Sequence, residues 1–143
     1  MEIISTTSAL GFKTVFGERQ HLLMNLLNTF LPLPHPIVEV NYLNSEIIPE
    51  KKDGKNGIVD VHCKDSHGRQ FIVEMQIGKQ ASFIKRALIN TSKVYSRQLT
   101  KEQHYRMAQP VYSLNLLDHQ IDEDETIWYH LCPHQSARFR QNN

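Results

Sequence analysis

Two apolar runs separated by a short turn-rich stretch constrain the fold of this chain more than any other feature. The runs cover residues 57–63 and 70–77, and the stretch between them contains aspartate, serine and glycine. This pattern is typical of an antiparallel β-hairpin. If the hairpin closes with Lys64 opposite Gln70, every other pair of residues in the two strands is fixed as well.

The alternation of side chains along a strand separates the apolar from the polar residues of this hairpin. The apolar faces carry Val59, Val61 and Cys63 in the first run and Phe71, Val73, Met75 and Ile77 in the second. Asp60 and His62 then lie on the other face of the first run. Glu74 and Gln76 share a face of the second run. The register given above pairs Asp60 directly with Glu74, about 5 Å apart at Cβ.

Two carboxylates that oppose each other on a half-buried sheet repel, and a divalent cation between them removes the conflict. Ligands that are all oxygen suit Mg²⁺ or Mn²⁺ far better than zinc. Such an ion can activate a water molecule for phosphodiester hydrolysis. The spacing by itself leaves a second interpretation open, in which Asp60 only borders a turn and Glu74 lies on a solvated face.

The rest of the chain predicts helices and further strands around the hairpin. Leucines at helical spacing predict a helix over residues 18–30, which the prolines within residues 31–36 end. Residues 37–43 form a β-branched run typical of a strand, and a polar loop follows at 49–56. Residues 111–117 predict a buried strand. With the second helix described next, the order is helix, three strands, helix, strand, which predicts an α/β fold.

The second helix, expected over residues 80–99, has an apolar side and an opposite basic side. The apolar side carries Phe83, Ile84, Ala87, Leu88, Thr91, Val94, Tyr95 and Gln98. The basic side carries Arg86, Lys93 and Arg97 within about 40° of one another, with Lys79 close to the same line. The formal net charge of the chain is only +1, so this local excess of positive charge is the surface that we expect to face the phosphates of a nucleic acid. A merely solvated helix face is the alternative.

Length and composition place the chain among ordinary globular proteins. Its 143 residues suffice for one domain and are too few for two of ordinary size, so we expect a single domain over residues 1–143. No secretory signal and no run of roughly 18 apolar residues are present, which predicts a cytoplasmic protein without a membrane partner. Cys63 and Cys132 form no CxxC pair, and free thiols are favoured over a disulfide or a zinc site. The acidic run at 122–125 is expected to lie in a solvated end.

Several motifs of this chain occur together in one known family. They are FKTVFG at 12–17, GIVDV at 57–61, FIVEMQ at 71–76, QASF at 80–83, RAL at 86–88, and Tyr105 followed by PVY at 110–112. Together they resemble the PD-(D/E)XK nuclease family transposases, also described as recombination-promoting nucleases. The resemblance extends from about residue 12 to residue 117, and the DV…IVEMQ pair is its most specific part.

The resemblance implies a restriction-endonuclease-like αβββαβ core with a mixed sheet flanked by helices. It implies Mg²⁺-dependent or Mn²⁺-dependent cleavage of double-stranded DNA, linked to recombination or transposition of mobile elements. The catalytic residues would be Asp60, Glu74 and Gln76, of which Asp60 and Glu74 would bind the metal. Gln76 stands where other branches of the superfamily have a lysine, and Glu46 is an accessory ligand or a loop cap. A homodimer is left open.

Two departures from the family pattern keep a second hypothesis open. Ala9 stands where the family usually has an acid, and Ile89 and Asn90 stand where it has two tyrosines. The chain also ends before family members normally do, so we expect a copy shortened at its C-terminus. The alternative function is therefore a catalytically inactive remnant, or a DNA-binding module, that retains the nuclease fold.

Overall fold

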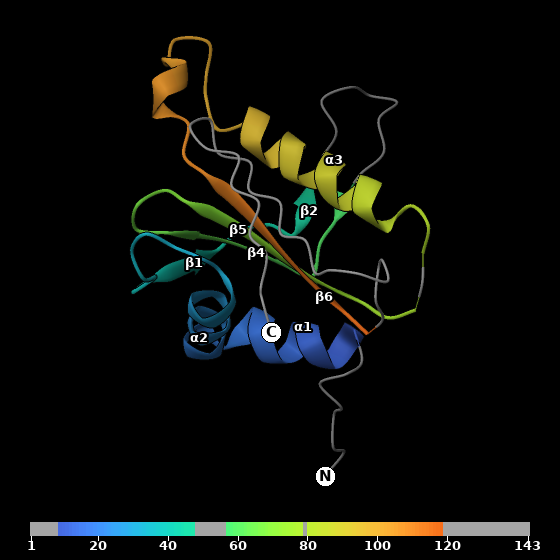
Figure 1. Cartoon of the computed structure of the whole chain (residues 1–143). Helices are drawn as coiled ribbons and strands as arrows, with labels where there is room; N and C mark the ends of the chain where they lie inside the picture. Colours follow the sequence, from blue (N-terminus) through green and yellow to red (C-terminus); the bar gives the residue numbers. More distant parts are fainter. Residues whose placement is uncertain (1–8, 48–56, 79, 119–143) are drawn as a thin grey trace.

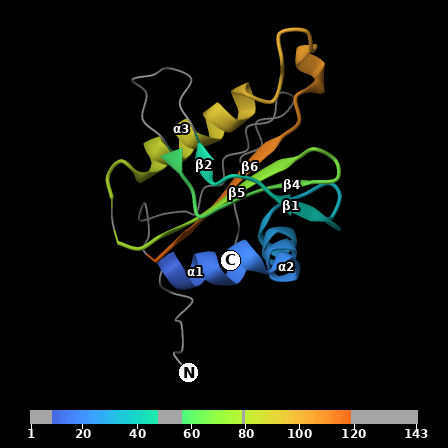
Figure 2. The same cartoon turned by 180° about the vertical axis from the view of Figure 1, so that it is seen from behind.

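The computed structural model describes residues 9–47, 57–78 and 80–118 of the chain. Within these ranges a sheet of mixed strand direction lies between two layers of helices (Figure 1). Figure 2, seen from behind, shows the same order of layers. The expected α/β fold with a mixed sheet flanked by helices is confirmed. No helix in these ranges is long and apolar enough to cross a membrane.

The strands form one main sheet and a small ribbon. The strands of the described residues are β1 (Val40–Tyr42), β2 (Glu46–Ile47), β3 (Gly57–Ile58), β4 (Val61–Asp65), β5 (Gln70–Gln76) and β6 (Val111–Leu117). The main sheet has the order β1-β4-β5-β6, and β2 pairs with β3 in the ribbon. The pairs β1 with β4 and β4 with β5 are antiparallel, whereas β5 and β6 are parallel.

The register of the central strands follows the expectation. Lys64 lies opposite Gln70 in the antiparallel pair, and β6 has the bounds that the sequence predicted. In the parallel pair Glu74 lies opposite Asn115. Because two adjacent parallel strands need a crossover connection, helix α3 (Phe83–Ser96) joins β5 to β6 across one face of the sheet. A 3₁₀ helix, η1 (Tyr105–Met107), lies in the connection between α3 and β6.

Each face of the sheet has its own hydrophobic core. The buried core under the N-terminal helices contains Phe12, Leu23, Leu27, Leu31, Ile37, Val40, Val61, Cys63, Phe71, Val73, Tyr112 and Leu114. The core under α3 contains Ile47, Val59, Ile72, Val94 and Val111. Neighbouring residues of β5 thus contribute to different cores, with Val73 on one face and Ile72 on the other. Glu74 follows the alternation of Ile72 and faces the α3 side.

The N-terminal helical region differs from the single helix expected over residues 18–30. The structure has two helices there, α1 (Ala9–Glu18) and α2 (Gln20–Phe30), with Arg19 in an extended conformation between them. Two glycines lower the helix propensity of α1, so its helical form depends on burial of residues such as Phe12, which is 2 % exposed. Sequence periodicity alone missed this helix for that reason.

Helix α3 is shorter than the expected helix and is rotated relative to it. Ile84 and Leu88, which were expected to face the core, are about half exposed, at 48 % and 53 %. Asn90 is buried instead and packs against Gly57, where an added Cβ would lie 2.2 Å from the Asn90 side-chain oxygen. The missing side chain of Gly57 allows this close approach, and a larger residue at that position would prevent it. The buried residues are Phe83, Ala87, Asn90, Thr91 and Val94.

The run over residues 57–63 is not one continuous strand. It divides into β3 and β4, with Val59 and Asp60 between them. The amide of Val59 donates a hydrogen bond to the carbonyl of Ser45 at 3.0 Å, so the chain leaves the hairpin here to pair with the segment before β2. Val59 therefore packs under α3, and the prediction that it shares a face with Val61 is wrong.

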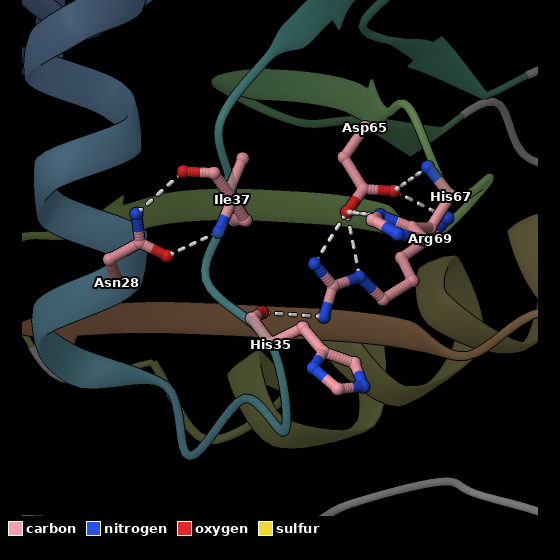
Figure 3. Close-up of polar contacts among 6 residues, drawn as sticks. All are labelled: Asn28, His35, Ile37, Asp65, His67 and Arg69. Atoms are coloured by element: carbon pink, nitrogen blue, oxygen red, sulfur yellow. Dashed lines mark hydrogen bonds and ion pairs between the residues drawn. The ribbon is translucent and has the colours of Figure 1, made fainter.

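The closed end of the β4–β5 hairpin holds a buried ion pair (Figure 3). The Arg69 side chain donates through Nε to Oδ2 of Asp65 at 2.7 Å, and its Nη2 lies 2.7 Å from the same oxygen. The other Asp65 oxygen accepts the amides of His67 at 3.0 Å and Arg69 at 2.9 Å. Arg69 Nη1 also donates to the carbonyl of His35 at 2.9 Å. Gly68 completes the turn with a φ of 82°, which favours glycine.

Some predictions fall outside the described residues. These are the polar loop at 49–56, the acidic run at 122–125, Cys132 and Lys79. Cys63 is buried and free.

Candidate active site

Asp60 lies at the bend where the first run of the hairpin is interrupted. The paired ladder begins one residue later, at Val61 opposite Val73, so Asp60 and Glu74 are adjacent to that ladder but not a pair within it. The Asp60 carboxylate Oδ2 accepts a hydrogen bond from the backbone amide of Met75 at 2.7 Å. A continued antiparallel strand would satisfy this amide with a backbone carbonyl, so the Asp60 side chain takes over that function. The bond holds the Asp60 carboxylate beside the peptide that follows Glu74.

Glu74 is a buried acid near the end of β5. Its exposed fraction is 6 %, and its Oε2 has no hydrogen-bond partner among the described residues. Burial raises the pKa of the Glu74 carboxyl, the Arg86 guanidinium opposes that rise, and the Asp60 carboxylate adds to it. The net pKa is raised. An acid that is buried without a donor for one oxygen is expensive to ionise unless a cation binds to it.

Gln76 and Arg86 form a polar link between β5 and α3. Arg86 donates one Nη to the side-chain oxygen of Gln76 at 2.9 Å and the other to Gln80 at 3.0 Å. Its guanidinium also lies over the Phe83 ring, 5.4 Å from the centroid. The Gln76 side-chain amide donates to the carbonyls of the next two residues at 3.1 and 3.3 Å. Gln76 therefore carries no charge itself but holds a positive charge beside Glu74.

The other predicted site residues are placed farther along the elements. Lys93 is partly buried in α3, and Arg97, which follows α3, is exposed. Arg86 interacts electrostatically with Glu74 and donates a hydrogen bond to Gln76. Glu46 is exposed in β2, and its backbone amide donates a hydrogen bond to the side-chain oxygen of Asn44 at 3.0 Å. Glu46 and Arg97 both line an open hollow of about 350 Å³.

A second hollow of about 350 Å³ opens on the other side of Asp60, toward α1. Lys13 and Thr14 of α1 line it together with Asp60, whereas Glu74 is not one of its lining residues. Asp60 is thus accessible from a recess, and Glu74 lies on the covered side beneath α3.

The donor atoms present fit a hard divalent cation better than any other metal. Within the described part of the chain no group of three or more histidine, cysteine, aspartate or glutamate side chains is placed to hold a metal. The two acids, Asp60 and Glu74, offer only oxygen, and Glu74 Oε2 is a buried acceptor without a donor. Mg²⁺ and Mn²⁺ are bound by one or two carboxylates together with water and phosphate oxygens, so two acids are sufficient.

A family model describing PD-(D/E)XK nuclease family transposases matches residues 8–136. The chain belongs to this family. The mixed sheet flanked by helices agrees with the nuclease-like fold that membership implies. Searches among curated proteins and among solved structures gave no significant match. A nuclease-related or transposase-related function follows, with DNA as the substrate of the family and divalent metals as its general cofactor.

Sequence reasoning missed two features of the site. The contact between Gln76 and Arg86 joins a strand to a helix, and no periodicity within either element reports it. The second feature is Asn115, which β6 places opposite Glu74. Strand alternation could have placed Asn115 on the same face as the buried Val111, but the parallel register with β5 had no signal in the sequence.

Proposed function

We propose that this chain is a divalent-metal-dependent DNA endonuclease that acts in recombination or transposition of mobile elements. The observation that carries the proposal is the buried Glu74, which has one oxygen without a partner among the described residues and a pKa that the Asp60 carboxylate helps to raise. Family membership supplies the substrate class, and the position of the two acids beside an exposed arginine supports phosphodiester hydrolysis rather than another reaction.

Asp60 and Glu74 are the residues that would hold the cation. The Met75 amide fixes the orientation of the Asp60 carboxylate, and burial in β5 fixes Glu74. When bound, the cation supplies a lower pKa for an attacking water and offsets the charge on the leaving oxygen. Neither acid needs to move a proton for this chemistry, since both bind the ion in their ionised forms.

Arg86 supplies the positive charge that a lysine at position 76 would supply. Gln76 accepts a hydrogen bond from one Nη of Arg86 and Gln80 accepts one from the other, which aims the guanidinium along the edge of the site. A guanidinium has five donors, so two such bonds leave donors for phosphate oxygens. We assign Arg86 to binding the phosphate next to the scissile bond and Gln76 to positioning Arg86. Lys93, Arg97 and Lys79 would extend the phosphate contacts along the duplex.

The test is a plasmid-nicking assay with Mg²⁺ that compares the wild-type chain with Asp60→Asn. Removing one metal-binding charge removes several kcal/mol of transition-state stabilisation, which corresponds to a loss of roughly 100-fold or more in the nicking rate. Glu39→Gln is the matched control because Glu39 is an exposed acid on a different part of the surface. Equal nicking rates for the wild type and Asp60→Asn would contradict the proposed site.

The same assay distinguishes the proposed endonuclease from the alternative, a DNA-binding chain without nuclease activity. A chain that binds duplex DNA but does not nick it at any Mg²⁺ or Mn²⁺ concentration would be a DNA-binding remnant of the family. Ala9, which replaces the usual acid at the start of α1, favours that alternative. Restoring the acid with Ala9→Glu and repeating the assay would then show whether this one position accounts for the loss.

A further inference from the structure

Asn115 and Glu74 extend from neighbouring strands toward the same face of the sheet. They are opposite each other in the parallel β5–β6 pair, where strands lie about 4.8 Å apart. Val111 of β6 packs in the core under α3, so Ser113 and Asn115, which follow at steps of two, face α3 as well. Glu74 faces α3 by the same alternation along β5. The end of the sheet under α3 therefore carries two polar side chains next to each other.

Both side chains leave an acceptor oxygen unpartnered. Glu74 Oε2 and Asn115 Oδ1 are buried and have no hydrogen-bond partner among the described residues. The amide nitrogen of Asn115 donates to the Ser113 hydroxyl at 3.0 Å, so the oxygen is the end of the amide that remains available. Each buried acceptor without a donor costs about 1–3 kcal/mol. Two such acceptors on adjacent strands cannot satisfy each other unless a proton or a cation lies between them.

We infer that Asn115 Oδ1 is a third protein oxygen of the metal site formed by Asp60 and Glu74. This inference rests on the proposed metal-dependent function. A cation would satisfy both orphaned oxygens at once, and a side-chain amide oxygen is a ligand that hard divalent cations accept. Because the amide is neutral, it adds a ligand without adding a third negative charge beside two acids. Ser113 acts on the site only through Asn115, as a positioning residue.

The competing explanation is a proton in place of the cation. In that case Glu74 would be protonated and would donate to Asn115 Oδ1, and the pair would be a purely structural hydrogen bond. The two explanations differ in what removal of the amide does. Loss of a ligand weakens metal binding, whereas loss of a hydrogen-bond acceptor for the protonated acid destabilises the metal-free protein and leaves metal binding unchanged or stronger.

The experiment is calorimetric titration with Mn²⁺ alone of the wild type, Asn115→Leu, Asn115→Asp, Ser113→Ala and Glu74→Gln. We expect Asn115→Leu to weaken Mn²⁺ binding by at least about 10-fold, because loss of a direct ligand should cost no less than loss of an outer-shell partner. Asn115→Asp should bind at least as tightly as the wild type, because it retains an oxygen at this place. Ser113→Ala should give a smaller loss, since the amide is then free to rotate. Urea unfolding in EDTA checks that each variant folds.

The outcomes distinguish this inference from the proposed function. Mn²⁺ affinity that is unchanged in Asn115→Leu but lost in Glu74→Gln would overturn the role of Asn115 and leave the two-acid metal site intact. Absence of Mn²⁺ binding by the folded wild-type chain would overturn the metal site itself, and the inference with it. A folded Asn115→Leu variant with weakened Mn²⁺ binding, together with recovery in Asn115→Asp, would support the third oxygen.

Discussion

The two ends of the β4–β5 hairpin each contain a buried carboxylate, and their surroundings differ in kind. At the closed end Asp65 is 5 % exposed and receives an arginine side chain and two backbone amides. At the open end Glu74 is 6 % exposed and has one oxygen without a donor, while the nearby Arg86 is bound to two glutamines. Similar burial therefore says little about role. What distinguishes the two acids is their partners: Asp65 is paired directly with a buried arginine, whereas Glu74 has one oxygen without a hydrogen-bond partner among the described residues.

The largest expected effect is at the closed end. Arg69→Met removes the cation from Asp65 and leaves a buried charge with only two amide donors, so the free energy of unfolding should fall by about 3–5 kcal/mol. Urea unfolding in EDTA measures this change. The double variant Arg69→Met with Asp65→Leu removes both charges and should recover much of the loss. A decrease in the free energy of unfolding of less than about 1 kcal/mol for Arg69→Met would mean that the ion pair does not stabilise the closed end of the hairpin.

A smaller effect is expected at the open end, where ionisation of the buried Glu74 decreases the free energy of unfolding. Since the folded-state pKa of Glu74 is raised, the folded chain holds a proton that the unfolded chain releases more readily. In EDTA the free energy of unfolding should therefore decline as the pH rises above about 4.5 and level off above the raised pKa of Glu74. The groups that act on Glu74 are Asp60, which strengthens the decline, and Arg86, which weakens it.

The variant Glu74→Gln should remove this decline, because it cannot ionise and nearly preserves the shape of the side chain. The measurement is urea unfolding in EDTA at several pH values between 4 and 8, with Glu39→Gln as the exposed control. A decline of equal slope in the wild type and in Glu74→Gln would show that another group is responsible.

The smallest effect on stability is expected for substitution of Arg86. Arg86 is exposed and its hydrogen bonds go to neutral glutamines, so Arg86→Ala should change the free energy of unfolding by no more than about 0.5 kcal/mol. Duplex DNA affinity should nevertheless fall, with the slope of its salt dependence reduced by about one. Lys85→Ala is the matched control, because Lys85 is the exposed neighbour that has no described contact with the site residues. Identical binding losses in the two variants would remove the special role of Arg86.

Local patterns predicted the central hairpin well. The turn-rich stretch after Lys64 and the alternation in the following run were sufficient for the register, since a hairpin is closed by contacts near in sequence. The density of apolar residues after Pro110 gave the bounds of β6. Asp60 and Glu74 were brought near each other by this register, and the assignment of metal binding to them stays a prediction.

Contacts between distant elements were not predictable in the same way. The break at Val59 depends on a hydrogen bond to Ser45, and competition between two pairing partners is not visible in one strand. The rotation of α3 depends on the space that Gly57 leaves for Asn90, because a helix with apolar residues on a wide arc can be buried along more than one line. The buried position of the ion pair at the closed end was missed because it involves the carbonyl of His35, which is distant in sequence from Arg69.

Because the crossover connection through α3 separates β5 from β6 in sequence, we expect the residues of the candidate site to come together at different stages of folding. Asp60 and Glu74 belong to a hairpin whose strands are joined by a short turn, and such pairs form early through local contacts. Asn115 lies beside Glu74 only once β6 has paired with β5, and β6 follows α3 in the sequence. Non-local pairing of this kind is slow. If the three oxygens form the proposed cation site, a chain still on the ribosome has two of them before β6 is made. Under the proposed function, cation binding by all three and DNA cleavage would then begin only after the synthesis of β6.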